Sequence, residues 1–147
     1  MPIEERIESV DQIRQWTDTI PFQYEYTAGV AGEKFLRGLM EGRILAGYCL
    51  NCEESSLPLR MYCVRCYGKI EKAVRVPPVG KVKAVTSGGE AGPKFVFVTF
   101  KGFRGGMIHR LLGKARVGSE VVAKFRPKKQ RTGSVNDIQG FEPRSRG

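Results

Sequence analysis

The sequence predicts a mainly β protein in which N-terminal α-helices precede a small cysteine-bearing ribbon and a five-stranded barrel. Three observations predict this fold class. All four cysteines of the chain form two C-x-x-C pairs. Helical spacing of apolar residues is confined to about the first forty positions. Short alternating segments separated by glycine turns fill the rest.

Two helices are expected in residues 1–42. Ser9-x-x-Gln12 fits a capping box for a first helix, which Pro21 ends. Thr27 is expected to cap a second helix that ends at Gly42. The apolar positions of the first helix are Val10, Ile13, Trp16 and Ile20. Those of the second are Phe35, Leu36, Leu39 and Met40.

An aromatic cluster of Phe22, Tyr24 and Tyr26 lies between the two predicted helices. Such a cluster either packs on the helices or forms an exposed docking surface. The sequence favours packing and leaves docking open. If the cluster is exposed, these three residues and Trp16 are the candidate contacts to a protein partner.

The cysteine pairs Cys49-x-x-Cys52 and Cys63-x-x-Cys66 are ten residues apart. Two such knuckles close on one metal ion, and four thiolates that leave no open position make a structural zinc site. A rubredoxin-like zinc ribbon is therefore predicted for residues 43–73, with one structural zinc ion. Iron held by the same four sulfurs is the next choice of metal.

Disulfides or a redox pair are the alternative for these cysteines. They fit less well, because no strand–helix pattern surrounds either pair and the charged start MPIEERIE does not resemble a signal peptide. No apolar run approaches the roughly 18 residues that span a bilayer. We therefore expect a soluble, cytoplasmic protein.

Five short strands are predicted in residues 74–147, namely 80–86, 95–100, 107–112, 121–125 and 138–141. Five strands joined by glycine turns over about 70 residues fit a small closed barrel, of which the OB-fold is the commonest kind. The predicted organisation is thus a helical arm at 1–42, the zinc ribbon at 43–73 and an OB-fold barrel at 74–147.

Charge is distributed unevenly along the chain. Residues 1–42 have a net charge of −4, whereas residues 43–147 have a net charge of +14. The basic part suits nucleic acid, anionic lipid or a phosphorylated ligand such as coenzyme A, and a merely solubilising surface remains an alternative. The densest patch runs from Lys124 to Arg131, which is either a phosphate clamp or a solvated loop.

Catalytic residues are scarce. The single histidine, His109, lies in a predicted barrel strand and is interpreted as structural. Neither paired carboxylates nor a phosphate-binding glycine motif is evident. We therefore expect a protein that is not an enzyme by itself.

Several motifs in order resemble a known family. Tyr26-Thr27-x-Gly29 opens a helix, and Gly42-x-Ile44 leads into the first cysteine. Pro58-x-Arg60 lies between the cysteine pairs, Gly80 to Thr86 opens the barrel, and 131–138 followed by 141–143 closes it. Together these motifs are similar to the zinc-ribbon/OB-fold proteins first catalogued as a domain of unknown function and later described as acyl-CoA-associated.

The resemblance implies a non-catalytic scaffold that docks on thiolase-superfamily enzymes, such as hydroxymethylglutaryl-CoA synthase, in lipid, isoprenoid or polyketide metabolism. It also implies that the barrel binds an acyl-CoA or fatty acyl ligand. Candidate ligand contacts, chosen by charge, are Arg104, Arg126, Lys128, Lys129 and Arg131. The aromatic run that contains Phe95, Phe97 and Phe100 either lines an apolar path or packs in the barrel.

Two other functions remain open. The first is a nucleic-acid-binding module, because zinc ribbons and OB-folds both occur in such proteins and the barrel half is basic. It is less favoured, since the strand aromatics fall in an apolar run that reads as buried. The second, a stand-alone hydrolase or transferase, is the poorest fit to a chain with one histidine.

Overall fold

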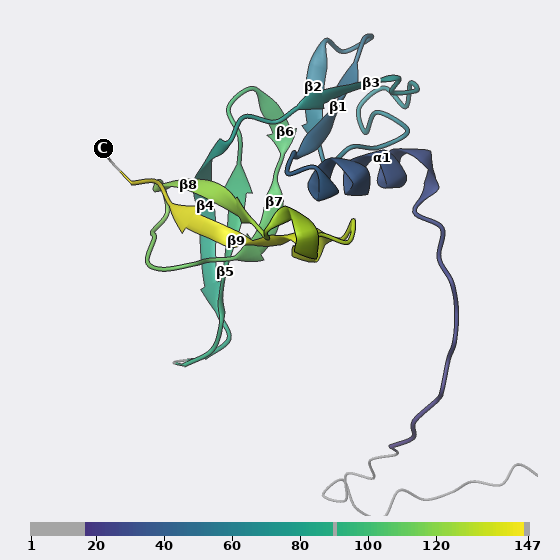
Figure 1. Ribbon diagram of the computed structural model, residues 1–147. Coiled ribbons are helices and arrows are strands. Elements are labelled where there is room, and N and C mark those ends of the chain that lie inside the picture. The colour runs from purple at the N-terminus through teal and green to yellow at the C-terminus, as the bar shows by residue number, and fades with distance from the viewer. Residues whose placement is uncertain (1–16, 90, 146–147) are drawn as a thin grey trace, which may run out of the picture.

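The computed structural model describes residues 17–89 and 91–145. Within them the chain is mainly β, with two sheets and a single α-helix. Figure 1 shows the sheets beside each other, with the helix under the ribbon sheet and residues 17–28 extending away from both. Most of the predicted first helix, including Trp16, lies outside the described residues. Residues 17–28 of the expected helical arm are not helical.

Helix α1 spans Gly29–Met40, close to the second predicted helix. Two details of that prediction are wrong. The cap position is Ala28 and no side chain caps the helix, so Thr27 has no capping role. Met40 is exposed, because the buried stripe of the helix consists of Phe35, Gly38 and Leu39.

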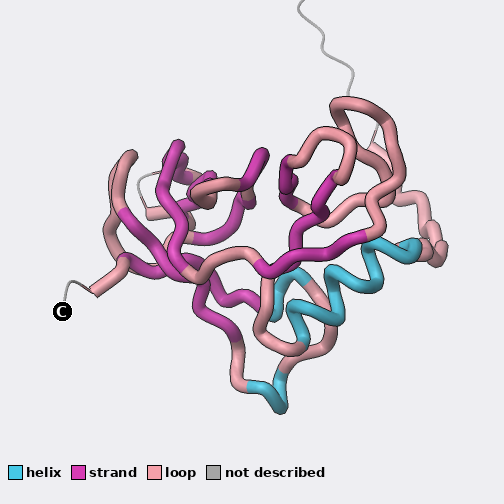
Figure 2. The backbone as a smooth tube through the Cα atoms, turned by 90° about the horizontal axis from the view of Figure 1, so that it is seen from above, coloured by secondary structure: helices cyan, strands magenta, loops and turns pink. Residues whose placement is uncertain are grey.

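The close approach of α1 to the ribbon depends on Gly38. A Cβ atom at this position would lie 2.9 Å from the Leu45 side chain and 3.1 Å from the Arg43 carbonyl oxygen. A larger residue would push the helix away from the strand that begins at Leu45. Figure 2 shows the helix running along the ribbon strands.

The ribbon sheet has the strand order β3-β1-β2-β6. β1 (Leu45–Cys49) pairs in antiparallel fashion with both β2 (Glu54–Leu57) and β3 (Lys72–Arg75). The fourth strand, β6 (Phe103–Gly105), comes from the barrel half of the sequence and runs parallel to β2. This pairing joins the ribbon to the barrel.

The second sheet has the order β7-β5-β4-β8-β9. Its strands are β4 (Val79–Ser87), β5 (Lys94–Thr99), β7 (Met107–Arg110), β8 (Glu120–Phe125) and β9 (Ile138–Pro143). Each strand begins and ends within two residues of a predicted strand, so the five-strand prediction for this half is confirmed.

The two edges of this sheet come together. Leu111, directly after β7, forms a parallel bridge with Phe141 of β9, and the Leu112 amide donates to the Phe141 carbonyl oxygen at 2.7 Å. A five-stranded sheet closed in this way is a small barrel of OB-like topology. Its interior contains Val82, Val96 and Val98, all almost fully buried.

One hydrophobic core runs through helix, ribbon and barrel. Phe35 and Leu39 of α1, Cys49 and Leu57 of the ribbon, and Phe141 of the barrel all belong to the same buried cluster. The domain boundaries predicted at 42/43 and 73/74 stay predictions. The hydrophobic core is continuous across both positions, so it marks no boundary there. No helix in residues 17–89 or 91–145 is long and apolar enough to cross a membrane.

The loop of residues 126–137, which we call the cationic loop, connects β8 to β9 and is built around Asp137. The Asp137 side chain is 1% exposed. Its carboxylate accepts hydrogen bonds from the backbone amides of Thr132 (2.8 Å), Gly133 (2.8 Å) and Ser134 (3.2 Å). Burial by itself would raise the pKa of this carboxyl, but the three amides and nearby Arg126 outweigh burial and lower the pKa.

We predict that Asp137→Asn destabilises the fold at neutral pH by about 1–3 kcal/mol, because an amide cannot accept all three hydrogen bonds. The lowered pKa fixes the sign of the pH dependence. The stabilisation is fully present above the pKa of the unfolded chain, about 4, and is lost as the pH falls through the lower pKa of the folded state. Urea unfolding of both proteins at pH 7 and at decreasing pH measures the difference. A difference that stays constant down to pH 3 would contradict this role.

Candidate metal centre and cationic loop

The four cysteines gather at one end of the ribbon. Cys49 ends β1, Cys52 lies in the turn between β1 and β2, and Cys63 and Cys66 lie in the loop that precedes β3. Their four sulfur atoms all lie within 4.8 Å of one another. Residues separated by up to 17 positions are thus brought into one cluster.

The sulfur spacing fits a tetrahedral metal site. The Sγ atoms of Cys49 and Cys66 are 3.5 Å apart, and those of Cys52 and Cys63 are 3.9 Å apart. Metal–sulfur bonds of about 2.3 Å in a tetrahedron separate the sulfurs by about 3.8 Å. A disulfide requires about 2.05 Å, so none of the four cysteines is disulfide-bonded.

Backbone amides donate hydrogen bonds to two of the four sulfur atoms. The amide of Arg65 donates to Cys63 Sγ and that of Gly68 donates to Cys66 Sγ, both at 3.4 Å. Hydrogen bonds from the amides of Cys66 and Arg65 lower the pKa of Cys63 to about 6, and the Gly68 amide lowers the pKa of Cys66. The hydrogen bond to Cys66, followed by burial, raises the pKa of Cys52 to about 12. Four thiolates at this spacing repel one another, so full deprotonation of the cluster requires a cation among them.

The backbone of the two knuckles follows one pattern. The residue after each pair, Glu53 and Tyr67, has a positive φ of 53° and 58° respectively. Gly68 follows the second knuckle by two residues and allows a close approach. A Cβ atom there would lie 2.8 Å from Asn51 Nδ2 and 3.2 Å from Cys66 Sγ. Gly68 is therefore needed for close approach to the sulfur.

The cations chosen from the sequence do not form one group. Arg126, Lys128, Lys129 and Arg131 lie in the cationic loop, whereas Arg104 lies in β6 on the ribbon sheet, 3.5 Å from the Glu54 carboxylate. Among the described residues, Arg126, Lys128 and Lys129 form no ion pair, and all three are exposed. Arg126 lies near the Asp137 carboxylate, so Lys128 and Lys129 are the candidates whose charges are most available to a ligand.

Arg131 holds the cationic loop against the rest of the molecule. Its Nε donates to the Arg126 carbonyl oxygen at 2.7 Å, and one terminal nitrogen donates to the Met40 carbonyl oxygen at 3.4 Å. Its guanidinium also lies over the Phe125 ring, 5.4 Å from the centroid. Arg131 thereby ties the loop to the C-terminus of α1, a structural function that the sequence did not reveal.

The strand aromatics face two ways. Phe100 is buried in the core at 3% exposure, whereas Phe95 and Phe97 are half-buried on the other face of β5. In the register of β5 and β7, Phe95 lies opposite Arg110, and Phe97 lies opposite Ile108, which is 71% exposed. The interpretation of the whole run as buried is therefore wrong for Phe95 and Phe97.

His109 makes structural contacts. Its Nδ1 accepts a hydrogen bond from the Arg110 amide at 2.8 Å, and Nε2 lies 3.1 Å from the Val135 carbonyl oxygen. Its ring meets Phe141 edge-on, with centroids 6.4 Å apart. Nε2 thus joins β7 to the cationic loop, whereas Nδ1 bonds within β7, and both contacts fit the structural interpretation of this histidine.

Neither a protein-family model nor a curated protein matches the sequence, but solved structures match the fold. A protein of unknown function from the DUF35 family of Sulfolobus solfataricus aligns with a TM-score of 0.64 and 24% identity, over 82% of this chain and 87% of the other. The Ltp2-ChsH2(DUF35) aldolase aligns with a TM-score of 0.59 and 15% identity, over 81% of this chain and 98% of the other.

The chain thus combines a four-cysteine ribbon with an OB-like barrel in one body. This is the fold of DUF35-family proteins. The resemblance indicated by the sequence is confirmed at the level of the fold.

We predict that the purified protein contains about one tightly bound metal ion per chain. Cys49→Ser should abolish stoichiometric binding and disorder the ribbon, because three thiolates hold the ion less tightly and Cys49 is also part of the core. Metal analysis and the dispersion of amide NMR signals measure the two effects. Leu50→Ser changes an exposed side chain of the same knuckle and is the matched control. Equal metal content in both variants would contradict a four-cysteine site.

Proposed function

We propose that this chain is a non-catalytic accessory subunit that docks on a thiolase-superfamily enzyme and binds an acyl-CoA substrate. The observation that carries the proposal is the segment of residues 17–28, which we call the aromatic segment. Its Phe22, Tyr24 and Tyr26 are 72%, 69% and 87% exposed. The sequence favoured packing of these side chains on the helices, and in the described part of the chain they do not pack there.

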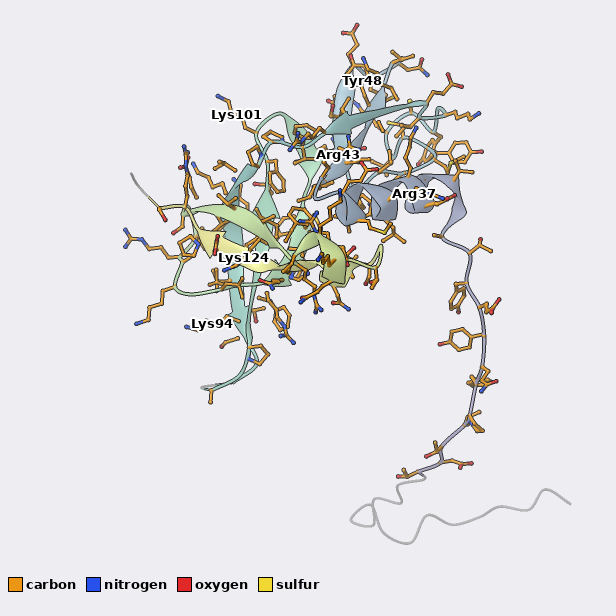
Figure 3. The ribbon with its side chains drawn as sticks, in the orientation of Figure 1. Arg37, Arg43, Tyr48, Lys94, Lys101 and Lys124 are labelled. Carbon is orange, nitrogen blue, oxygen red and sulfur yellow. The ribbon has the colours of Figure 1, made fainter. Side chains whose placement is uncertain are left out.

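Large aromatic side chains exposed in a row favour a protein partner, because leaving them in water costs the free energy that burial would supply. Figure 3 shows side chains along a segment that runs clear of the body. A solved chain that shares this fold carries the name Ltp2-ChsH2(DUF35) aldolase, which names a DUF35 protein together with Ltp2. Both observations support a docking role for Phe22, Tyr24 and Tyr26, and we extend the proposed contact to Trp16.

The metal centre is proposed to be structural. Cys49, Cys52, Cys63 and Cys66 would hold one zinc ion, and four thiolates leave it no position for substrate. Iron in the same sulfur set remains the alternative. In the proposed accessory role, the metal centre fixes the shape of the ribbon and takes no part in catalysis.

The side chains of the described barrel support a non-catalytic role. Glu120 pairs with Arg144 at 3.0 Å, Glu142 pairs with Lys124 at 3.4 Å, and Asp137 is saturated by backbone amides. With His109 engaged through both nitrogens, no acid–base pair is free in this half of the described chain. Chemistry is accordingly assigned to the partner enzyme.

The cationic loop is the proposed site for the phosphates of coenzyme A. In OB-folds the loop between the fourth and fifth strands is a common ligand contact, and the cationic loop occupies this position between β8 and β9. Lys128 and Lys129 would contact the phosphates directly, while Arg126 and Arg131 shape the loop. Arg104, on the ribbon sheet, is retained only as a more distant candidate. We place the complex in cytoplasmic lipid, isoprenoid or polyketide metabolism.

We predict that the triple substitution Phe22→Ser, Tyr24→Ser and Tyr26→Ser abolishes recovery of a thiolase-superfamily enzyme in an affinity pull-down from nuclease-treated native lysate. The reason is loss of the apolar contact area, and mass spectrometry identifies the bound proteins. Deletion of residues 1–42 is avoided, since it would remove Phe35 and Leu39 from the core.

The matched control for that experiment changes exposed apolar residues elsewhere, namely Ile108→Ser and Val117→Ser. These variants should recover the enzyme as the wild type does. Stoichiometric recovery by the triple variant would contradict docking through the aromatic segment.

We predict that Lys128→Gln with Lys129→Gln weakens binding of coenzyme A about tenfold, because two charge-assisted contacts to phosphate are lost. Isothermal titration calorimetry with coenzyme A, on the chain and on its enzyme complex, measures the affinity. Lys94→Gln with Lys101→Gln removes the same charge from exposed barrel positions away from the loop (Figure 3). If both double variants lose affinity equally, the cationic loop is not the site.

A second candidate function, nucleic-acid binding, is favoured by the outer face of β5 and β7. Phe95, Phe97 and Ile108 form an apolar strip there, and Arg110 is opposite Phe95. Exposed aromatic rings beside cations are the usual platform for single-stranded nucleic acid on an OB-fold.

Fluorescence titration with a labelled oligonucleotide separates this function from charge alone. Binding that persists at physiological salt and is lost in Phe95→Ala would support nucleic-acid binding. On the main proposal, we expect weak binding that disappears as salt is raised and does not respond to Phe95→Ala.

A further inference from the structure

The aromatic segment has the side-chain pattern of a strand that lacks a sheet. Ile20, Phe22, Tyr24 and Tyr26 occupy alternate positions and are 58–87% exposed. The residues between them are Pro21, Gln23 and Glu25. Period-2 alternation of apolar and polar residues is typical of a half-buried strand.

The backbone geometry agrees with this pattern. The segment has no helix, and the Phe22 amide donates to the Ile20 carbonyl oxygen at 3.0 Å, so a tight turn at Pro21 precedes the extended part. The rings of Tyr24 and Tyr26 contact each other with centroids 5.0 Å apart, which places them on the same side. Tyr24 and Tyr26 thus already lie on one face, and no described strand pairs with residues 22–26.

Charge restricts the kind of partner. Residues 17–28 contain the carboxylates of Asp18 and Glu25 and no lysine or arginine. A surface that receives the segment should therefore offer apolar pockets for the rings and cations near the two carboxylates.

The chain itself does not provide such a surface at the β3 edge of its ribbon sheet. The edge strand β3 has only four residues, and its Lys72 already lies over the Tyr48 ring, 5.5 Å from the centroid. The groove beside it, lined by Ala31, Leu59 and Ile70 among others, holds about 40 Å³. Two tyrosine rings need far more room, so this groove does not receive them.

We propose that residues 22–26 bind by adding as an edge strand to a β-sheet of the partner enzyme. Main-chain hydrogen bonds to the free edge would supply affinity, and pockets for Phe22, Tyr24 and Tyr26 would supply specificity. The polar side chains of Gln23 and Glu25 face away from those pockets. This inference rests on the proposed docking function and specifies its geometry.

Amide exchange on the full complex tests the geometry. The isotope-labelled chain is mixed with the purified enzyme recovered in the pull-down, and exchange of the amides of residues 22–26 is followed by NMR. In a strand, amides alternate between the two edges, so one alternate set should exchange about tenfold or more slowly on binding while the other remains fast. Uniform protection, as in a helix, or no protection would overturn the proposal.

Alanine substitutions supply the second measurement. Tyr24→Ala and Tyr26→Ala should each weaken the affinity for the enzyme about tenfold or more, whereas Gln23→Ala, which removes an uncharged side chain from the opposite face, should change it less than about threefold. A helical binding mode would require Phe22 and Tyr26 and spare Tyr24, and that outcome would overturn strand addition.

The outcomes separate the two levels of the proposal. If no enzyme binds the wild-type chain, the proposed function fails and strand addition fails with it. If the enzyme binds and the alternating pattern is absent, the docking function stands and strand addition alone is wrong.

Discussion

The closure of four sulfur atoms on one another is the constraint on which the rest of the ribbon depends. Its three own strands have four or five residues each, too few to form a core by themselves. Cys49 and Cys63 are buried and belong to the same hydrophobic cluster as the barrel interior. A metal ion that holds the four sulfurs together would therefore also stabilise the ribbon end of the common core.

The ribbon is connected to the barrel by the parallel pairing of β2 with β6. On the opposite side, Arg131 ties the cationic loop to the end of α1, and Asp137 fixes the loop from inside. Ribbon, barrel and helix thus form one body with a continuous core. The aromatic segment leaves that body at Gly29, whose positive φ of 67° directs the chain out of the helix. A folded body that carries an exposed aromatic segment fits the proposed accessory role.

Local patterns predicted much of this structure, and non-local contacts account for what they missed. Alternation and glycine turns located all five barrel strands, and cysteine spacing predicted the cluster of four sulfurs. The parallel pairing of β6 with β2 joins residues almost 50 positions apart, and a three-residue strand has no pattern of its own. The roles of Asp137 and Arg131 were missed for a similar reason, because a charged residue in a polar loop looks the same whether it is solvated or buried. The exposure of Tyr24 and Tyr26 was misjudged, because an aromatic residue type indicates burial but does not distinguish packing within the chain from packing against a partner.

X-ray absorption spectroscopy at the metal edge of the purified, full-length protein tests the central constraint most directly. If the four cysteines close on one ion, the spectrum should require four sulfur neighbours, at about 2.3 Å for zinc, and no lighter ligand. A fit that requires nitrogen or oxygen in the first shell, or fewer than four sulfurs, would mean that the site is open. The metal centre would then be a candidate for chemistry, and the structural role assigned to it would be wrong.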